Sequence, residues 1–165
     1  MNRKIPSGKL NRSSHVMTQG VERTANRAML RAVGFTDGDF EKPIVGIATA
    51  GSDVSPCNMH LDEISEVSKR RLKDLGAMAM TFHTFVVTDG EAMGHEGMKA
   101  SLVSREVIAD SIELDALGHQ MDALRGVGGC DKAIPGTVMG LARRNRPAVF
   151  IYGGTIAAGC HRGKP

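Results

Sequence analysis

Residues 42–50, KPIVGIATA, decide the fold class of this chain. They form a continuous apolar run with several β-branched side chains, which is typical of a strand buried on both faces of a sheet. Three later stretches show the same strand-like character, at 77–90 (AMAMTFHTFVVTDG), 123–129 (ALRGVGG) and 147–154 (PAVFIYGG). The chain therefore has several candidate strands for a buried sheet.

Helical patterns alternate with these runs. They cover residues 18–35, 60–76, 104–120 and 134–146, with apolar residues at helical spacing. Ser104 is a candidate N-cap for the third helix, with Val107 leaving its capping box incomplete, and the Gly- and Met-rich stretch 90–104 before it is expected to be a long loop. The alternation predicts an α/β fold with a largely parallel sheet flanked by helices.

Length and composition predict one domain with a polar arm. The 165 residues suit a single core, and we assign residues 1–17 to a basic arm, 18–159 to the α/β domain and 160–165 to a truncated tail. The net charge of +3 and the scarce aromatic residues argue against nucleic-acid binding, and no apolar run is long enough for a membrane span. Three cysteines do not make a disulfide framework, so we expect a reducing, cytoplasmic setting, or a plastid or mitochondrial one in a eukaryote.

Reactive side chains follow the predicted strands. Cys57 lies in SDVSPCN after the first strand, Asp89 in TDG at the end of the second, and Cys130, Asp131 and Lys132 after the third, while GGT (153–155) follows the fourth. Ligands bind at the carboxyl ends of the strands in an open parallel sheet. We therefore expect cluster- and metal-binding residues at this edge, with Cys57 and Cys130 in one pocket.

These residue types leave several chemistries open. Two thiols from separate loops suit a soft metal or an iron–sulfur cluster, and the two aspartates suit a hard cation such as Mg²⁺. Lys132 could act as a base, as a Schiff-base amine or as a phosphate contact. The plainer alternatives are a buried cysteine that packs as a small apolar residue and an Asp-Gly pair that only makes a turn.

His95 and Glu96, in MGHEGM, are further candidate ligands, although a histidine in a loop is more often a hydrogen-bonding surface residue. The sequence contains no CxxC pair, no P-loop and no dinucleotide fingerprint after the first strand. Zinc-ribbon, thioredoxin-type, P-loop and dinucleotide-binding functions are therefore unsupported.

Four long motifs carry a family resemblance. RTANRAMLRAVGF (23–35), PCNMHLDEISEVSK (56–69), TDGEAMGHEGMKASLVSREVIADSIE (88–113) and GGCDKAIPGTVMGLARRNRPAVFIYGG (128–154) together resemble the amino-terminal domain of the dihydroxy-acid dehydratase family. That family also includes sugar-acid and phosphogluconate dehydratases. The resemblance covers about residues 12–159, and its loop TAGSDVSPCN differs from the commoner version, which leaves the substrate within the family less secure.

The resemblance implies a role for each residue at the predicted edge. Cys57 and Cys130 correspond to two of three thiolate ligands of an iron–sulfur cluster, [2Fe–2S] in many members and otherwise [4Fe–4S]. Asp89 and Asp131 correspond to magnesium ligands, and Lys132 to a lysine that is carbamylated and so becomes an anionic ligand. Cys160 lies where the family usually has a glycine-rich turn, so we expect it to be incidental.

The resemblance also implies a reaction. The family removes water from 2,3-dihydroxy acids to give 2-keto acids, and in valine and isoleucine biosynthesis the substrates are 2,3-dihydroxyisovalerate and 2,3-dihydroxy-3-methylvalerate. The third cysteine, a further acidic ligand and the serine base lie downstream in the family, in a carboxyl-terminal domain that this sequence lacks. We therefore expect no catalytic base within these residues and no turnover by them alone, whereas full-length members form homodimers or tetramers.

Three other functions stay open from the sequence: a fragment of a sugar-acid or phosphogluconate dehydratase, a non-catalytic metal-binding remnant, and a plain α/β binding domain with structural cysteines.

Overall fold

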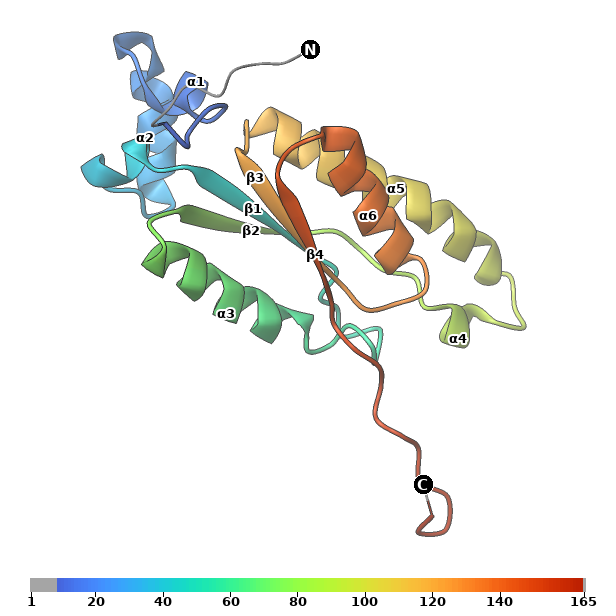
Figure 1. Cartoon of the computed structure of the whole chain (residues 1–165). Coiled ribbons are helices and arrows are strands. Elements are labelled where there is room, and N and C mark those ends of the chain that lie inside the picture. Colours follow the sequence, from blue (N-terminus) through green and yellow to red (C-terminus); the bar gives the residue numbers. More distant parts are fainter. Residues whose placement is uncertain (1–8, 165) are drawn as a thin grey trace.

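Four parallel strands form the centre of the molecule (Figure 1). The computed structural model describes residues 9–164. The strands are β1 (Ile44–Thr49), β2 (Met78–His83), β3 (Ala123–Gly128) and β4 (Ala148–Tyr152), in the spatial order β2-β1-β3-β4. All pairings are parallel, which confirms the predicted α/β class.

The run KPIVGIATA supplies the central strand. All six residues of β1 are buried, and β1 pairs with β2 on one side and with β3 on the other. A strand with two strand neighbours and helices on both faces has no solvent-facing side, which explains its continuous apolar pattern.

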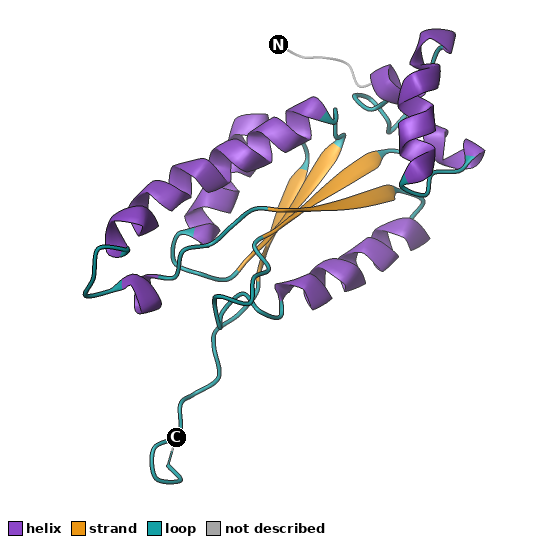
Figure 2. Cartoon of the chain, turned by 180° about the vertical axis from the view of Figure 1, so that it is seen from behind, coloured by secondary structure: helices purple, strands orange, loops and turns teal. Residues whose placement is uncertain are grey.

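Helices cover both faces of the sheet (Figure 2). Helix α3 (Leu61–Asp74) lies on one face, and α5 (Met98–Gly118) and α6 (Ala133–Arg144) lie on the other. The chain moves outward from β1 to β2, then returns past β1 to β3, so right-handed crossovers place the connecting helices on opposite faces. This reversal leaves β1 and β3 as neighbours whose connections leave in opposite directions.

Helices α5 and α6 pack closely against each other. A Cβ atom on Gly136 would lie 2.7 Å from the Arg105 carbonyl oxygen, so the backbones approach too closely for a larger residue. Ile108 and Ile112 of α5 are fully buried in the core beside this contact. The small residues of α6 therefore set the distance between the two helices.

The predicted start of the third helix is wrong. Helix α5 begins at Met98 rather than at Ser104, and the short helix α4 (Asp89–Ala92) occupies part of the stretch expected to be loop. Ser104 is buried inside the helix, where its hydroxyl donates to the Ser101 carbonyl oxygen at 2.5 Å instead of capping an N-terminus. The helix thus includes residues that look like a loop in the sequence.

The predicted helix over 18–35 is also divided. The structure has α1 (His15–Thr18), the 3₁₀ turn η1 (Val21–Arg23) and α2 (Thr24–Ala32), with an extended backbone at Gln19 between the first two. A second 3₁₀ helix, η2 (Asp37–Glu41), leads into β1.

Residues 1–8 of the expected arm lie outside the described residues, but its later part is firmly packed. The Asp122 carboxylate accepts hydrogen bonds from the Ser13 amide at 2.6 Å, the Ser14 amide at 3.1 Å and the Ser14 hydroxyl at 2.6 Å. The Ile44 amide at the start of β1 donates to the same carboxylate at 2.9 Å. A buried carboxylate needs such donors, so this part of the segment belongs to the domain and not to a free arm.

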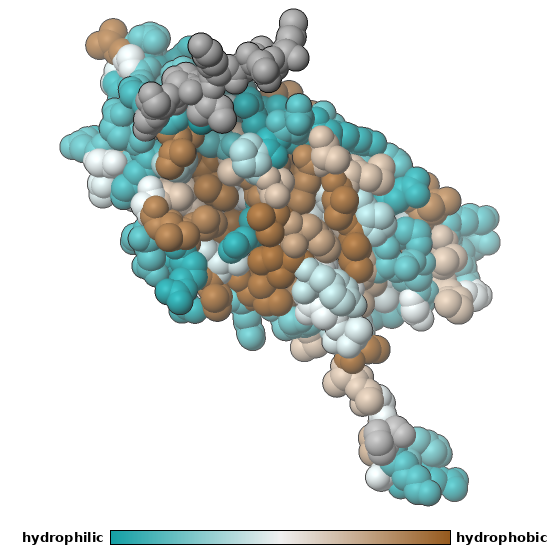
Figure 3. Space-filling view, viewed as in Figure 1, coloured by the Kyte–Doolittle hydropathy of each residue, from teal (hydrophilic) through white to brown (hydrophobic). Residues whose placement is uncertain are grey.

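One half of the sheet has little cover. Apolar residues gather across the middle of the face seen in Figure 3. On the edge strand β4, Val149 and Tyr152, whose side chains point to opposite faces of the sheet, are 57% and 54% exposed. Within residues 9–164, no helix combines the length and the apolar character that a membrane crossing requires.

Candidate functional site

The loops after the four strands enclose one pocket. Its volume is about 600 Å³, and its lining includes Cys57 after β1, Asp89 after β2, Cys130 and Asp131 after β3, and Thr155 after β4. The structure therefore brings together residues from all four predicted strand ends. Lys132 lies beside the pocket and contacts both aspartates through its amine.

The thiols lie at the point where the sheet changes direction. Cys57 follows β1 and Cys130 follows β3, and these two strands are neighbours whose connections diverge. Divergent connections open a crevice at the carboxyl ends of such strands, which is where open α/β sheets bind ligands. The topology thus explains why the two cysteines face the same pocket.

Close backbone contact holds the two cysteine loops together. A Cβ atom on Gly129 would lie 2.2 Å from the Cys57 carbonyl oxygen, so only glycine permits the observed approach. The fully buried Asn58 fixes the first loop, because its side-chain amide donates to the Ala50 carbonyl oxygen at 2.7 Å.

Both thiols have hydroxyl neighbours. Cys57 Sγ lies 3.3 Å from Ser55 Oγ, and the Cys130 thiol donates to Thr88 Oγ1 at 3.7 Å. Burial raises the pKa of Cys57, the hydrogen bond with Ser55 partly offsets this, and the neighbouring Cys130 raises the pKa further. Burial therefore disfavours the thiolate form of Cys57.

The carboxylates meet at one amine. Lys132 Nζ donates to Asp89 Oδ2 at 2.8 Å and also to Asp131, while the Ser101 hydroxyl donates to the second oxygen of Asp89. These contacts lower the pKa of Asp89 to about 2, with the hydrogen bond to Asp131 the largest cause, followed by those from Lys132 and Ser101. Asp131 and Asp89 in turn raise the pKa of Lys132. The cluster therefore binds a positive charge between two carboxylates.

The donor chemistry fits a soft and a hard metal site side by side. Two thiols suit iron, and two carboxylates around a cationic group suit Mg²⁺. Within residues 9–164, no three His, Cys, Asp or Glu side chains lie close enough to hold a metal ion by themselves.

Comparison with known proteins identifies the family. Residues 42–164 match the family model described as dihydroxy-acid/6-phosphogluconate dehydratase N-terminal. The chain belongs to the dihydroxy-acid/6-phosphogluconate dehydratase family.

Its relatives include proteins named dihydroxy-acid dehydratase. The chain is 56% identical to the one from Nitrosomonas europaea over 154 residues, which cover 93% of this chain and 28% of the relative. It is 55% identical to those from Halorhodospira halophila, over 93% of this chain and 27% of the relative, and from Acaryochloris marina, over 90% and 27%. The chain thus spans little more than a quarter of the length of the curated relatives that it matches.

The other candidate ligands lie outside the shared pocket. His95 Nε2 lies 2.8 Å from the Glu91 carbonyl oxygen, and the Gly97 amide donates to His95 Nδ1 at 3.0 Å, so local backbone groups occupy both ring nitrogens. Glu96 is exposed and pairs with Lys99 at 2.5 Å. Cys160 is exposed in the tail, away from the other two cysteines of this dehydratase-family chain.

Sequence reasoning missed several residues at the site. Ser101 reaches Asp89 from the first turns of α5, and Thr88 reaches Cys130 from the β2 loop. Glu91 and Tyr152 also line the pocket. The sequence could have indicated Thr88, because this residue directly precedes Asp89. It could not have indicated the Ser101 contact, because that contact depends on where α5 begins, and the start predicted from the sequence was wrong.

Proposed function

We propose that this chain is the amino-terminal, metal-binding part of a dihydroxy-acid dehydratase, a hydro-lyase that converts 2,3-dihydroxy acids into 2-keto acids. The observation that carries the proposal is the shared pocket, in which a pair of thiols lies beside a lysine-linked pair of carboxylates. The names of the relatives agree with this reading.

In this proposal, two cofactors occupy the pocket. Cys57 and Cys130 hold an iron–sulfur cluster, [2Fe–2S] or [4Fe–4S], and Asp89 and Asp131 hold Mg²⁺. When bound, the cluster and the magnesium ion supply Lewis acids for the departing hydroxyl group and for the substrate carboxylate and 2-hydroxyl.

Lys132 has a second proposed role. As an ammonium it donates hydrogen bonds to Asp89 and Asp131 and offsets one of their two negative charges. Addition of its neutral amine to carbon dioxide, with loss of a proton, gives a carbamate that adds an anionic oxygen ligand beside the two carboxylates. As an ammonium, the Lys132 side chain thus supplies the positive charge beside the two carboxylates. As a carbamate, it would instead bind the metal cation.

The pocket walls favour an alkyl-substituted acid over a phosphorylated one. Among the described residues, Ile134, Tyr152 and Ile156 contribute apolar lining, and no arginine or lysine lines the pocket. A phosphate group would need cationic partners there, whereas a branched alkyl group needs apolar contact. We therefore favour 2,3-dihydroxyisovalerate and 2,3-dihydroxy-3-methylvalerate, the precursors in valine and isoleucine biosynthesis, over 6-phosphogluconate.

A chimera tests this proposal directly. The residues of this chain would replace the matched 28% of the Nitrosomonas europaea relative. Keto-acid formation would then be measured with 2,3-dihydroxyisovalerate and with 6-phosphogluconate. We expect turnover of the first substrate and none of the second.

Substitutions in the chimera show whether the named residues carry the activity. Cys57→Ser and Asp89→Asn should reduce turnover by more than the roughly 10- to 100-fold that supporting groups cost at metal sites. Asp74→Asn is the matched control, because Asp74 lies at the exposed end of α3. A folded chimera without turnover, or with turnover indifferent to Asp89→Asn, contradicts the proposal.

The 165 residues alone should show no turnover of 2,3-dihydroxyisovalerate, because the pocket contains only part of each ligand set. Detectable keto-acid formation by the purified chain would contradict this expectation.

A further inference from the structure

The outer edge of β2 is open. In the described part of the chain, β2 pairs only with β1. The Met78 amide donates to the Pro43 carbonyl oxygen at 2.9 Å, so the backbone groups of Met78 and of every second residue after it point toward β1. The amides and carbonyls of Ala79 and Thr81 therefore point outward, where another strand could pair with them.

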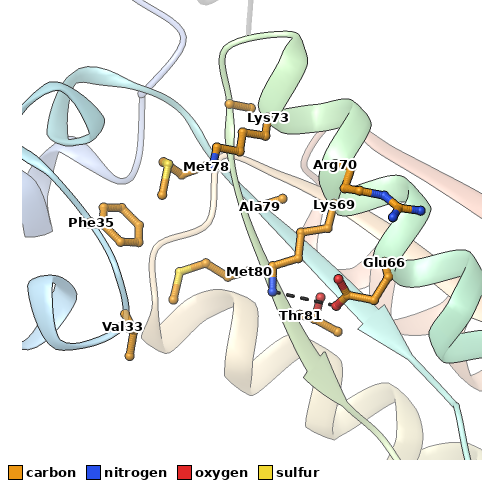
Figure 4. Close-up of a pocket in the computed structure, with 11 residues that line it drawn as sticks. Val33, Phe35, Glu66, Lys69, Arg70, Lys73, Met78, Ala79, Met80 and Thr81 are labelled. Atoms are coloured by element: carbon orange, nitrogen blue, oxygen red, sulfur yellow. Dashed lines mark ion pairs between the residues drawn. The ribbon is translucent and has the colours of Figure 1, made fainter.

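A pocket runs along this open edge (Figure 4). Its volume is about 480 Å³, and the alternation of side chains along β2 gives it two different walls. One wall is apolar and contains Val33, Phe35, Met78 and Met80. The other wall is formed by α3 and contains Lys69, Arg70 and Lys73.

The α3 wall carries excess positive charge. Glu66, which pairs with Lys69 at 3.9 Å, is the acidic residue in the pocket lining, so the three basic residues of this wall leave it with a net positive charge. Beneath them, the hydroxyl oxygen of Thr81 is buried and has no hydrogen-bond partner among residues 9–164.

We propose that the outer edge of β2 binds an extended segment of a partner polypeptide in which acidic and apolar residues alternate. The segment adds a strand to the sheet, with backbone hydrogen bonds to Ala79 and Thr81. Its apolar side chains face Phe35 and Met80, and its acidic side chains face Lys69 and Lys73.

Charge distinguishes this partner from a second copy of the chain. Two copies joined through β2 would bring two basic α3 walls together, which is unfavourable. The surface is also separate from the proposed metal site, because Lys73 lies at the end of α3 that leads into β2, while the metal residues follow the strands' carboxyl ends.

Peptide binding to the full chain tests the proposal. The probe is a fluorescently labelled acetyl-EVEIEVE-amide, measured by anisotropy, with hydrogen exchange of the chain followed by NMR. We expect saturable binding and slower exchange of the Ala79 and Thr81 amides. A peptide of the same composition with all glutamates at one end should bind at least about tenfold more weakly, since it cannot match both walls.

Matched variants identify the basic wall. Lys69→Gln with Lys73→Gln should weaken binding about tenfold, because each exposed ion pair contributes roughly 0.2–1 kcal/mol. Arg71→Gln with Lys99→Gln removes the same charge from exposed positions outside the pocket and should leave binding unchanged. Absence of binding, protection elsewhere than on β2, equal loss in both double variants, or equally tight binding of inorganic phosphate would overturn the proposal.

Discussion

The two ends of the sheet use aspartates in opposite ways. At the amino end, Asp122 accepts hydrogen bonds from three backbone amides and one hydroxyl of the chain itself. At the carboxyl end, Asp89 and Asp131 share the amine of Lys132, and Asp89 also accepts from Ser101. The first carboxylate is satisfied mainly by fixed backbone groups, and the other two share one flexible lysine side chain, which a metal ion replaces in the proposed function.

This difference separates Asp122, which stabilises the fold, from Asp89 and Asp131, which the proposed function makes metal ligands. Backbone amides cannot leave without unfolding the segment that carries them, so Asp122 fixes the N-terminal segment to β1 and β3. A lysine side chain can rotate away or be modified while the fold persists. The two ends should therefore respond differently to substitution.

Asp122→Ala should have the largest effect on stability. It leaves the amides of Ser13, Ser14 and Ile44 without their acceptor, and each buried unsatisfied group costs about 1–3 kcal/mol. We expect a loss of about 3 kcal/mol or more in the free energy of unfolding, measured with urea. Asp74→Ala, at the exposed end of α3, should change it by less than about 0.5 kcal/mol. Equal effects of the two substitutions would remove the structural role assigned to Asp122.

Gly129→Ala should have the next largest effect, at the carboxyl end. The added Cβ meets the Cys57 carbonyl oxygen at 2.2 Å, and such overpacking costs about 1–3 kcal/mol. Separation of the two loops should also speed the reaction of Cys57 and Cys130 with a thiol reagent in a Cys160→Ser background. Gly118→Ala, whose Cβ meets nothing within 4 Å, should alter neither property adversely. Unchanged thiol reactivity in Gly129→Ala would show that the loops do not depend on this contact.

Lys132→Met should have the smallest effect on stability, about 1 kcal/mol at pH 7, because it removes a largely buried cation from two carboxylates. The pKa of Asp89 should rise from about 2 toward its ordinary value of 3.8. NMR titration of Asp89 checks this shift, and Lys99→Met, at an exposed ion pair, is the control.

The pH dependence follows from the same pKa. Because folding lowers the pKa of Asp89, its contribution to stability is complete above about pH 4 and is lost as the pH falls toward 2. The loss of stability over this interval should be smaller in Lys132→Met than in the unsubstituted chain. An unchanged acid profile would show that Lys132 does not hold the Asp89 carboxylate in its charged form.

The sequence predicted the central strand well because burial on both faces leaves a continuous apolar pattern. The continuous run 42–50 became the central strand, and the side chains after each predicted strand lie around one pocket. Parallel strands bring their carboxyl ends to one edge whatever their order, so this part of the site needed no knowledge of the strand order.

The remaining features depend on contacts that local sequence does not encode. The glycines of 90–104 suggested a loop, yet α5 begins at Met98, and Ser101 in its first turns donates a hydrogen bond to the distant Asp89. The polar segment before α1 has the composition of an arm, yet its Ser13 and Ser14 amides donate hydrogen bonds to Asp122, which lies more than a hundred residues later in the chain. Both errors arise where a distant partner compensates for weak local preference.

Anaerobic reconstitution with ferric iron, sulfide and excess dithiothreitol tests the account most directly, because the dithiol can complete a cluster held by Cys57 and Cys130. We predict bound iron and visible charge-transfer bands that disappear in Cys57→Ser and in Cys130→Ser but persist in Cys160→Ser. A colourless, iron-free chain, or bands that survive loss of Cys57 and Cys130, would contradict the proposed metal site at the carboxyl end of the sheet.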